Sequence, residues 1–220
     1  MLAGELINHE VPQLQLKDTV GKALQLINDF KVSHLPVVSG KQYLGLISED
    51  DLLDIERTKS SIETLQENFI TAVIEEHQYF LNAVSFINQM ETTIVPVVNK
   101  EKELVGVITT TDLLKALGNF SGANEIGGIV VLEMKRSQFS ISEISRLVES
   151  NDATILHLNT TVHVETGLLT VTLHLNKKEI AAVIATFQRY EYDIVYSHGD
   201  ENFETDIQNN FRHLMNYLHI

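Results

Sequence analysis

The chain has 220 residues, of which 44% are hydrophobic and 21% are charged, as expected of a folded globular protein. Its formal net charge is −14 and its closest basic groupings are dipeptides, so binding to a nucleic-acid backbone is not expected. No apolar run approaches the roughly 20 residues that span a bilayer, and the N-terminus does not resemble a signal peptide. The absence of cysteine excludes disulfides and thiolate metal sites. We therefore expect a cytoplasmic protein with no membrane partner.

Two sequence motifs occur twice in the first half of the chain. The segment 34–38 (His-Leu-Pro-Val-Val) returns at 94–98 (Ile-Val-Pro-Val-Val), a displacement of 60 positions. The segment 45–52 (Gly-Leu-Ile-Ser-Glu-Asp-Asp-Leu) returns at 106–113 (Gly-Val-Ile-Thr-Thr-Thr-Asp-Leu), a displacement of 61 positions. A period of this length indicates a repeated supersecondary unit, and two copies favour a pseudo-twofold pair over a solenoid.

Each copy predicts the same order of elements: strand, helix, strand, strand, helix. Apolar residues at helical spacing predict first helices over 20–30 and 80–90, with Thr19 available as a cap for the earlier one. A Pro-Val-Val strand, a polar turn and a second strand follow, and further helices begin near Asp51 and Asp112. Because neither copy can easily bury its sheet alone, we expect the two copies to dock. The expected repeats cover residues 1–60 and 61–118.

The pattern changes after residue 118. Residues 119–126 are rich in Gly, Asn and Ser and predict a linker. Residues 127–199 predict strand-helix-strand-strand-helix-strand, the ferredoxin-like plan, and residues 200–220 predict a C-terminal amphipathic helix. The fold class is thus α/β (α+β). The expected strands cover 129–134, 154–165, 168–175 and 193–197, and the helices cover 141–148 and 180–187.

The two central strands of this region predict a hairpin. A two-residue turn at Thr166-Gly167 pairs Val164 with Leu169, Val162 with Val171, and Leu158 with Leu175, all on one apolar face. The other face carries a polar row: His157, Asn159, Thr161, His163, Thr170, Thr172 and His174.

This polar row does not predict a metal site. His157 and His163 lie about 20 Å apart at the rise of a strand, so they cannot bind one ion. His157 and His174 are expected as diagonal neighbours, with no acid or third histidine beside them. We interpret the row as solvated or as facing an interface. The sequence also lacks a nucleophile elbow, a phosphate-loop lysine motif and a His-Glu-x-x-His motif, so we expect no catalytic residues and no enzyme.

The segments Ser48-x-x-Asp51 and Thr109-x-x-Asp112 are the strongest functional candidates. Each lies where a strand leads into a helix, where backbone N–H groups favour an anion, and a hydroxyl and a carboxylate can bind a phosphate and a ribose. The same spacing is also that of a capping box, which only closes the start of a helix. The spacing alone leaves both interpretations open.

The repeated Pro-Val-Val strands and Gly-h-Ile-Ser/Thr-x-x-Asp-Leu segments (h is apolar) resemble a tandem pair of CBS domains, a Bateman module. The resemblance implies adenosine-containing ligands such as AMP, ATP or S-adenosylmethionine in clefts between the copies. It implies that the aspartate binds the ribose, that Ser or Thr lies near the phosphate, and that the segment before the first helix frames the base. Carried over, one cleft would use Ser48, Asp51, Pro12 and Gln13, and the other Thr109, Asp112, Ala72 and Val73.

Neither motif carries the arginine that many nucleotide-binding members have. Glu49 and Asp50 follow Ser48, whereas Thr110 and Thr111 follow Thr109, and Glu75 and Glu76 lie near the second approach. These charges favour adenosine, AMP or S-adenosylmethionine over ATP, and favour the Thr109/Asp112 cleft for any phosphate-bearing ligand.

Residues from about 129 to 198 resemble an ACT domain, and the whole chain resembles acetoin-utilisation (AcuB-type) regulators. The turn 135–140 (Lys-Arg-Ser-Gln-Phe-Ser) lacks the Pro and Gly of amino-acid-binding ACT domains, which favours sheet pairing between subunits instead. The sequence therefore predicts a non-catalytic sensor of an adenosyl ligand, a homodimer that acts on an unknown target protein. The alternative is an interaction scaffold whose clefts are degenerate and bind no ligand.

Overall fold

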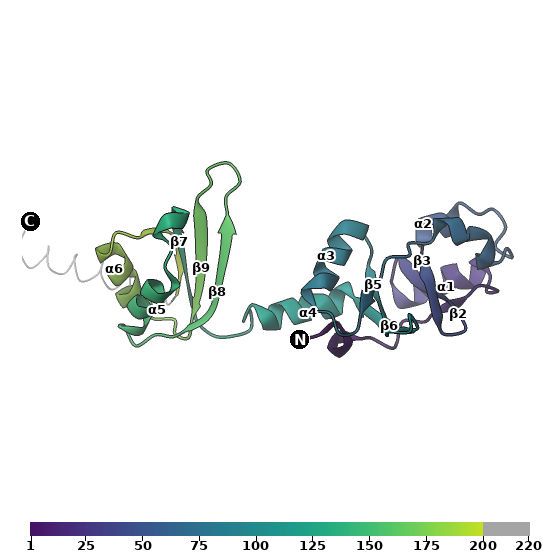
Figure 1. The fold of residues 1–220 in the computed structure, drawn as a ribbon, viewed down its shortest axis with the longest axis horizontal. Coiled ribbons are helices and arrows are strands. Elements are labelled where there is room, and N and C mark those ends of the chain that lie inside the picture. The colour runs from purple at the N-terminus through teal and green to yellow at the C-terminus, as the bar shows by residue number, and fades with distance from the viewer. Residues whose placement is uncertain (200–220) are drawn as a thin grey trace, which may run out of the picture. The chain divides into compact units, whose positions relative to one another are not determined.

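The chain divides into two compact units after Leu117, and the computed structural model describes residues 1–199 (Figure 1). The predicted helix over residues 200–220 lies outside the described residues. Among the residues that are described, no helix is both long and apolar enough to cross a membrane.

The first repeat has the predicted order of elements. Its strands form a three-stranded sheet in the order β1-β2-β3, with β1 and β2 parallel and β2 and β3 antiparallel. Thr19 caps the first helix, since its Oγ1 accepts a hydrogen bond from the Lys22 N–H at 3.2 Å. The elements are η1 (Ala3–Leu6, a 3-10 helix), β1 (Leu14–Gln15), α1 (Val20–Phe30), β2 (His34–Ser39), β3 (Gln42–Ser48) and α2 (Glu49–Leu53).

The second repeat reproduces this topology down to its strand register. Val37 pairs with Gly45 in the first sheet and Val97 pairs with Gly106 in the second, and the ladder is irregular after each of these pairs. The last helix extends to Phe120, two residues into the segment predicted as a linker. The elements are η2 (Ile62–Asn68, 3-10), β4 (Ile74–Glu75), α3 (Leu81–Met90), β5 (Ile94–Val98), β6 (Leu104–Thr109) and α4 (Thr110–Phe120).

The two repeats share one hydrophobic core, as their sequences predict. The central strands contribute equivalent side chains from each copy, and burial of this kind is the main stabilising term of folding. Fully buried members include Leu35, Val37 and Ile47 from the first copy and Val95, Val97 and Ile108 from the second.

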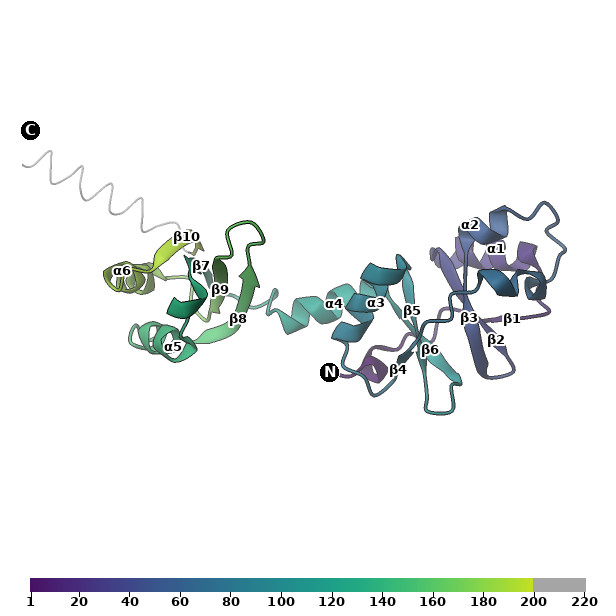
Figure 2. The same cartoon turned by 45° about the horizontal axis from the view of Figure 1, so that its top comes forward.

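The C-terminal unit is an antiparallel sheet in the order β10-β7-β9-β8, the strand order of the predicted ferredoxin-like plan. Both of its α-helices lie on one face of this sheet (Figure 2), where they cover alternate residues such as Val130, Leu132 and Leu173. Ser140 caps the first of these helices, since its Oγ accepts the Glu143 N–H at 3.4 Å. The elements are β7 (Gly128–Met134), η3 (Arg136–Gln138, 3-10), α5 (Ile141–Glu149), β8 (Ile155–Val162), β9 (Leu169–Leu175), α6 (Ala181–Arg189) and β10 (Asp193–His198).

The hairpin has the predicted faces but not the predicted register. Val162 pairs with Leu169 and Leu158 pairs with Leu173, so the prediction of a two-residue turn at Thr166-Gly167 was wrong. The His163 N–H bonds to the Leu168 carbonyl at 2.9 Å, which closes a longer loop, and Val164 is 96% exposed. A shift of two residues keeps every side chain on its face, which explains why the face prediction holds.

The polar face differs from its prediction in detail. His157 and His174 are directly opposed rather than diagonal, and Glu133 and Asp193 lie on the same face of the sheet. His174 is buried, and a Cβ added at Gly127 would lie 2.8 Å from its Nε2, so this end of the face is not solvated. The Phe120 ring meets the His157 ring edge-on, with centroids 5.8 Å apart. The residues of the chain that are described contain no cluster of three metal-ligating side chains.

Candidate functional site

Ser48 and Thr109 both cap the helices that follow them. The Ser48 Oγ accepts the Asp51 N–H at 3.1 Å and donates to the Asp51 carboxylate. The Thr109 Oγ1 accepts the Asp112 N–H at 3.1 Å and donates to Asp112 Oδ2 at 2.6 Å. The capping hypothesis is therefore confirmed for both motifs, and each carboxylate also accepts a hydrogen bond from the hydroxyl of its cap. Capping does not exclude binding, because a carboxylate offers about four acceptor sites.

Each aspartate is also contacted by an asparagine from the segment that leads into the other repeat. Asn8 Nδ2 donates to Asp112 Oδ2 at 3.2 Å, and Asn68 Nδ2 donates to Asp51 Oδ1 at 2.7 Å. Neither asparagine is among the site residues that the sequence motifs predict. A signal was present, since the 60-residue displacement of the repeats relates Asn8 to Asn68.

Backbone contacts show that these leading segments cross between the repeats. The Asn8 N–H donates to the Val107 carbonyl at 2.7 Å, and the Ile70 N–H donates to the Leu46 carbonyl at 2.9 Å. Glycine permits the close approach, because a Cβ added at Gly106 would lie 2.4 Å from Ile7 Cγ2. The first leading segment thus lies on β6, and the second lies on β3.

This crossing corrects the predicted composition of the two clefts. Pro12 and Gln13 were assigned to Ser48 and Asp51, and Ala72 and Val73 to Thr109 and Asp112. The structure exchanges these partners: the segment with Pro12 and Gln13 faces β6, and the segment with Ala72 and Val73 faces β3. We call the cleft of Ser48, Asp51, Ala72 and Val73 the first cleft, and the cleft of Thr109, Asp112, Pro12 and Gln13 the second cleft.

The second cleft contains a cavity of about 260 Å³. This volume lies just below the range of about 300–1,000 Å³ that is typical of small-molecule sites. Asn8 lines this cavity and also donates a hydrogen bond to the Asp112 carboxylate, whereas Asp112 and Thr109 themselves are not lining residues. Its lining comes from the first leading segment (Asn8, His9, Val11, Pro12, Gln13), from β2 (Pro36) and from β6 (Leu104, Val105, Gly106, Val107).

Asp112 carries a stabilised negative charge. Burial by itself raises the pKa of this carboxyl, but hydrogen bonds from Thr109 and Asn8 and the positive charge of Lys115 lower it below its ordinary value. Both side-chain hydrogen bonds go to Oδ2, and no side chain within residues 1–199 donates to Oδ1. Asp112 can therefore accept further hydrogen bonds from hydroxyl groups in the cleft.

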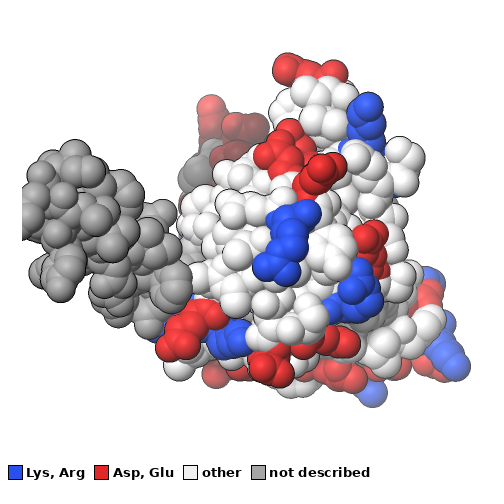
Figure 3. Space-filling model, turned by 90° about the vertical axis from the view of Figure 1, so that its left-hand side faces the viewer, with Lys and Arg blue, Asp and Glu red and all other residues white. Residues whose placement is uncertain are grey.

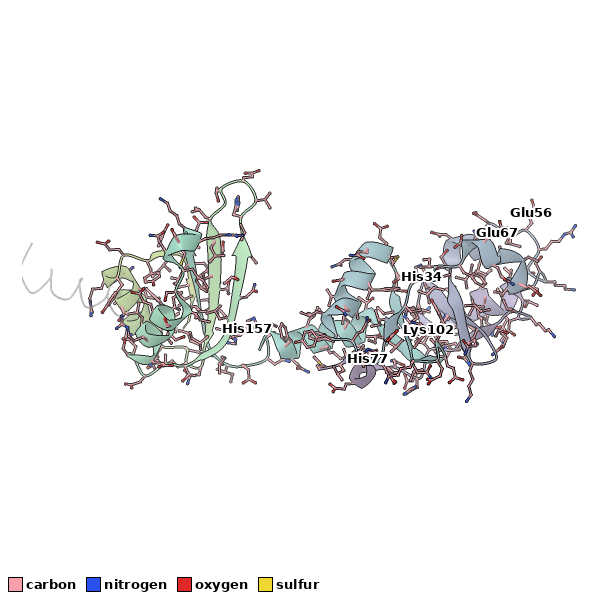
Figure 4. The ribbon with its side chains drawn as sticks, in the orientation of Figure 1. His34, Glu56, Glu67, His77, Lys102 and His157 are labelled. Carbon is pink, nitrogen blue, oxygen red and sulfur yellow. The ribbon has the colours of Figure 1, made fainter. Side chains whose placement is uncertain are left out.

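The first cleft is more completely satisfied by its own residues. Both carboxylate oxygens of Asp51 accept hydrogen bonds, from Ser48 and from Asn68. The Ala72 carbonyl accepts a hydrogen bond from the Tyr43 hydroxyl at 3.4 Å. His34 is buried nearby on β2 (Figure 4), and its Nδ1 has no hydrogen-bond partner in the described part of the chain.

Charges near the clefts differ from the sequence expectation. Glu75 pairs with Lys102 at 2.9 Å and lies 3.5 Å from His77 (Figure 4), and the hydrogen bond and charge of Lys102 lower the pKa of Glu75. The face drawn in Figure 3 is that of the C-terminal unit, and on it Lys and Arg lie among acidic and uncharged residues.

Comparisons with known proteins identify the N-terminal unit. The CBS domain family model matches residues 3–57 and 72–119. Inosine-5'-monophosphate dehydrogenase of Methanocaldococcus jannaschii is 30% identical over 115 residues, which cover 51% of this chain but only 23% of the dehydrogenase. That likeness is confined to the CBS part.

Solved structures with similar folds include three proteins of low sequence identity. A CBS domain pair/ACT domain protein from Thermotoga maritima is 21% identical with a TM-score of 0.49, covering 55% of this chain and 98% of that one. CBSX2 in complex with AMP is 20% identical with a TM-score of 0.47, covering 54% and 97%. A putative acetoin utilization protein (AcuB) from Vibrio cholerae is 21% identical with a TM-score of 0.47, covering 56% and 95%. Since these TM-scores lie below 0.5, the assignment rests on the family model and on the duplicated topology. The N-terminal part of the chain is thus a tandem CBS domain pair, spanning residues 3–119 and followed by a C-terminal domain.

Proposed function

We propose that this protein is a non-catalytic regulatory sensor that binds an adenosyl ligand (AMP, adenosine or S-adenosylmethionine) in the second cleft. The observation that carries the proposal is the Asp112 carboxylate, whose Oδ1 accepts no side-chain hydrogen bond from residues 1–199 and whose partner Asn8 lines a cavity of about 260 Å³. CBS domain pairs commonly bind adenosyl ligands, which supports this choice of ligand class.

The geometry suggests a role for each wall of the second cleft. The base would occupy the cavity between Pro12, Pro36 and β6, where it removes the apolar surface of these residues from water. The ribose hydroxyls would donate to Asp112 Oδ1. A phosphate would lie toward Thr109 and the N-terminus of α4, with Lys115 as the nearby positive charge.

Isothermal titration calorimetry with adenosine, AMP and S-adenosylmethionine tests the proposal on matched variants. Hydrogen bonds to a charged group contribute about 1.5–3 kcal/mol each, so loss of two in Asp112→Ala should weaken binding by more than roughly 100-fold. Asp51→Ala is the matched control in the first cleft and should retain most of the affinity. Loss of binding in Asp51→Ala with retention in Asp112→Ala would place the ligand in the first cleft and contradict the proposal. Absence of any ligand-induced rise in melting temperature would favour the scaffold alternative.

The charge of the ligand provides a second comparison. The net charge of −14 repels a polyphosphate, and neither Ser/Thr-x-x-Asp motif contains an arginine. AMP should therefore bind more tightly than ATP at low salt without magnesium. If ATP binds more tightly in a direct competition, basic residues such as Lys115 reach the phosphates and the charge argument is wrong.

We further propose that the C-terminal unit is an ACT-like domain that forms a homodimer. Its strand β8 lies at the edge of the sheet, spans eight residues and contains no Asp, Glu, Lys, Arg or Pro, the residues that block edge pairing. Leu156 and Val162 on this strand are exposed. Sedimentation velocity at micromolar concentration should show a dimer that Thr160→Lys weakens. A monomer for the unaltered protein would refute this assignment.

A further inference from the structure

We propose that the side chain of Tyr43 is an internal plug of the first cleft, so that the CBS pair holds one adenosyl ligand rather than two. This inference rests on the proposed function, because it concerns which of the two clefts receives the ligand. It makes Tyr43 a specificity-determining residue that acts by occupying space.

Tyr43 and Leu104 occupy equivalent places in the two repeats. Val38 pairs with Tyr43 in the β2-β3 ladder, and Val98 pairs with Leu104 in the β5-β6 ladder, each at the first position after the irregularity. Leu104 lines the 260 Å³ cavity of the second cleft. The structure therefore places an aromatic ring in the first cleft where the second cleft has a shorter aliphatic side chain.

The Tyr43 side chain reaches from one wall of the first cleft to the other. It starts on β3, and its hydroxyl donates toward the Ile70 carbonyl at 3.1 Å and the Ala72 carbonyl at 3.4 Å. These carbonyls belong to the second leading segment, the counterpart of the segment that forms the opposite wall of the cavity in the second cleft. Burial raises the pKa of the Tyr43 phenol, as expected for a side chain enclosed by both walls. The hydroxyl thus ties the Tyr43 ring to the second leading segment, whose Ile70 carbonyl also accepts the Leu46 N–H at 2.9 Å.

The leading segments differ in length in a way that matches this plug. Each crosses the partner strand at a backbone bridge, Asn8 with Val107 and Ile70 with Leu46. Five residues (9–13) then separate Asn8 from β1, whereas three residues (71–73) separate Ile70 from β4. The longer segment surrounds the cavity of the second cleft, and the shorter one lies close enough for Tyr43 to bond to it.

The carboxylates show the same asymmetry between the clefts. Each oxygen of Asp51 accepts a hydrogen bond from a protein side chain, whereas Oδ1 of Asp112 accepts none from residues 1–199. The α2 helix, which contains Asp51, has only five residues, and its first turn contains three acidic side chains, Asp51 included. The first cleft therefore has its space, its acceptors and its helix terminus already occupied by groups of this chain.

Reciprocal exchange of the two residues tests the plug. Calorimetry with adenosine and with AMP should give one ligand per chain for the unaltered protein and two for Tyr43→Leu, and Asp51→Ala added to Tyr43→Leu should return the value to one. Tyr43→Phe keeps the ring and should still give one. Leu104→Tyr should install a plug in the second cleft and weaken binding at least tenfold, with circular dichroism used to verify folding.

The outcomes separate this inference from the proposed function. One ligand in both the unaltered protein and folded Tyr43→Leu, or two in the unaltered protein, would overturn the plug and leave adenosyl binding intact. No ligand in the unaltered protein but one in Tyr43→Leu would support the plug and refute the second cleft as the site. No binding in either protein would overturn both. Leu104→Tyr that binds as tightly as the unaltered protein would also overturn the plug, even if Tyr43→Leu failed to fold.

Discussion

Replacing His34 with isoleucine should stabilise the CBS pair. His34 is only 8% exposed, and its Nδ1 has no partner among the residues that the structure describes. The second repeat places a fully buried isoleucine, Ile94, at the equivalent register position, since His34 pairs with Ser48 and Ile94 pairs with Thr109. A buried polar atom without a partner costs about 1–3 kcal/mol. We therefore expect His34→Ile to raise the free energy of unfolding by about 1–3 kcal/mol at pH 7.5.

The gain should increase at lower pH. Burial lowers the pKa of His34, although the carboxylates of Asp51 and Asp50 act in the opposite direction. A histidine whose pKa is lower in the folded state takes up a proton on unfolding once the pH falls below about 6.5, the pKa of an exposed histidine. The unaltered protein therefore loses stability on acidification, whereas isoleucine does not titrate. The difference between the two proteins should be larger at pH 5.5 than at pH 7.5.

Urea unfolding followed by circular dichroism at the two pH values measures this difference. The reciprocal variant Ile94→His is the matched control, and it should unfold at lower urea than the unaltered protein. The reasoning is refuted if His34→Ile unfolds at the same or a lower urea concentration, or if its advantage does not grow at pH 5.5.

Three further predictions concern the second cleft and the hairpin. Gly106→Ala should lower the melting temperature and weaken AMP binding, because the added Cβ would lie 2.4 Å from Ile7 Cγ2. Gly118→Ala is the control, since its added Cβ would have no atom within 4 Å, and equal melting temperatures for the two variants would contradict the prediction. Asp112 has a lowered pKa, so its carboxylate adds stability that is lost as the pH falls below about 4, and Asp112→Asn should flatten the acid limb of a stability-against-pH curve. Val171→Thr should lower the free energy of unfolding in urea by about 1–3 kcal/mol because it buries a hydroxyl, whereas Val164→Thr should have no effect. Similar losses of stability in the two variants would instead support the register of a two-residue turn.

The sequence was sufficient to predict the repeated fold because the repeated residues are those that set strand register. Val37 opposite Gly45 and Val97 opposite Gly106 recur as a pair, so the duplicated motif reflects duplicated backbone geometry. The hairpin register was less determined. A shift of two residues keeps the apolar face of β8 and β9 intact, so alternation of polar and apolar residues does not distinguish a two-residue turn from a longer loop.

The assignment of residues to clefts needed three-dimensional information. Nothing in a linear pattern indicates that the leading segment of each repeat crosses to the other copy. The contacts of Asn8 with Asp112 and of Asn68 with Asp51 are separated by 104 and 17 positions. The sequence motifs also do not indicate Tyr43 and His34. Each is recognised only when it is compared with the residue at the equivalent register position of the other repeat, Leu104 for Tyr43 and Ile94 for His34.

The crossing of the leading segments makes each cleft a joint between the two repeats. Asn8 precedes the first sheet yet bonds to Asp112 at the start of the last helix of the second repeat, so a ligand held there bridges elements of both copies. Ligand binding and separation of the two repeats are then thermodynamically linked. If separation lowers the affinity for the ligand by some factor, the bound ligand shifts the equilibrium against separation by the same factor. Occupancy of the cleft would then depend on how firmly the two repeats are held together.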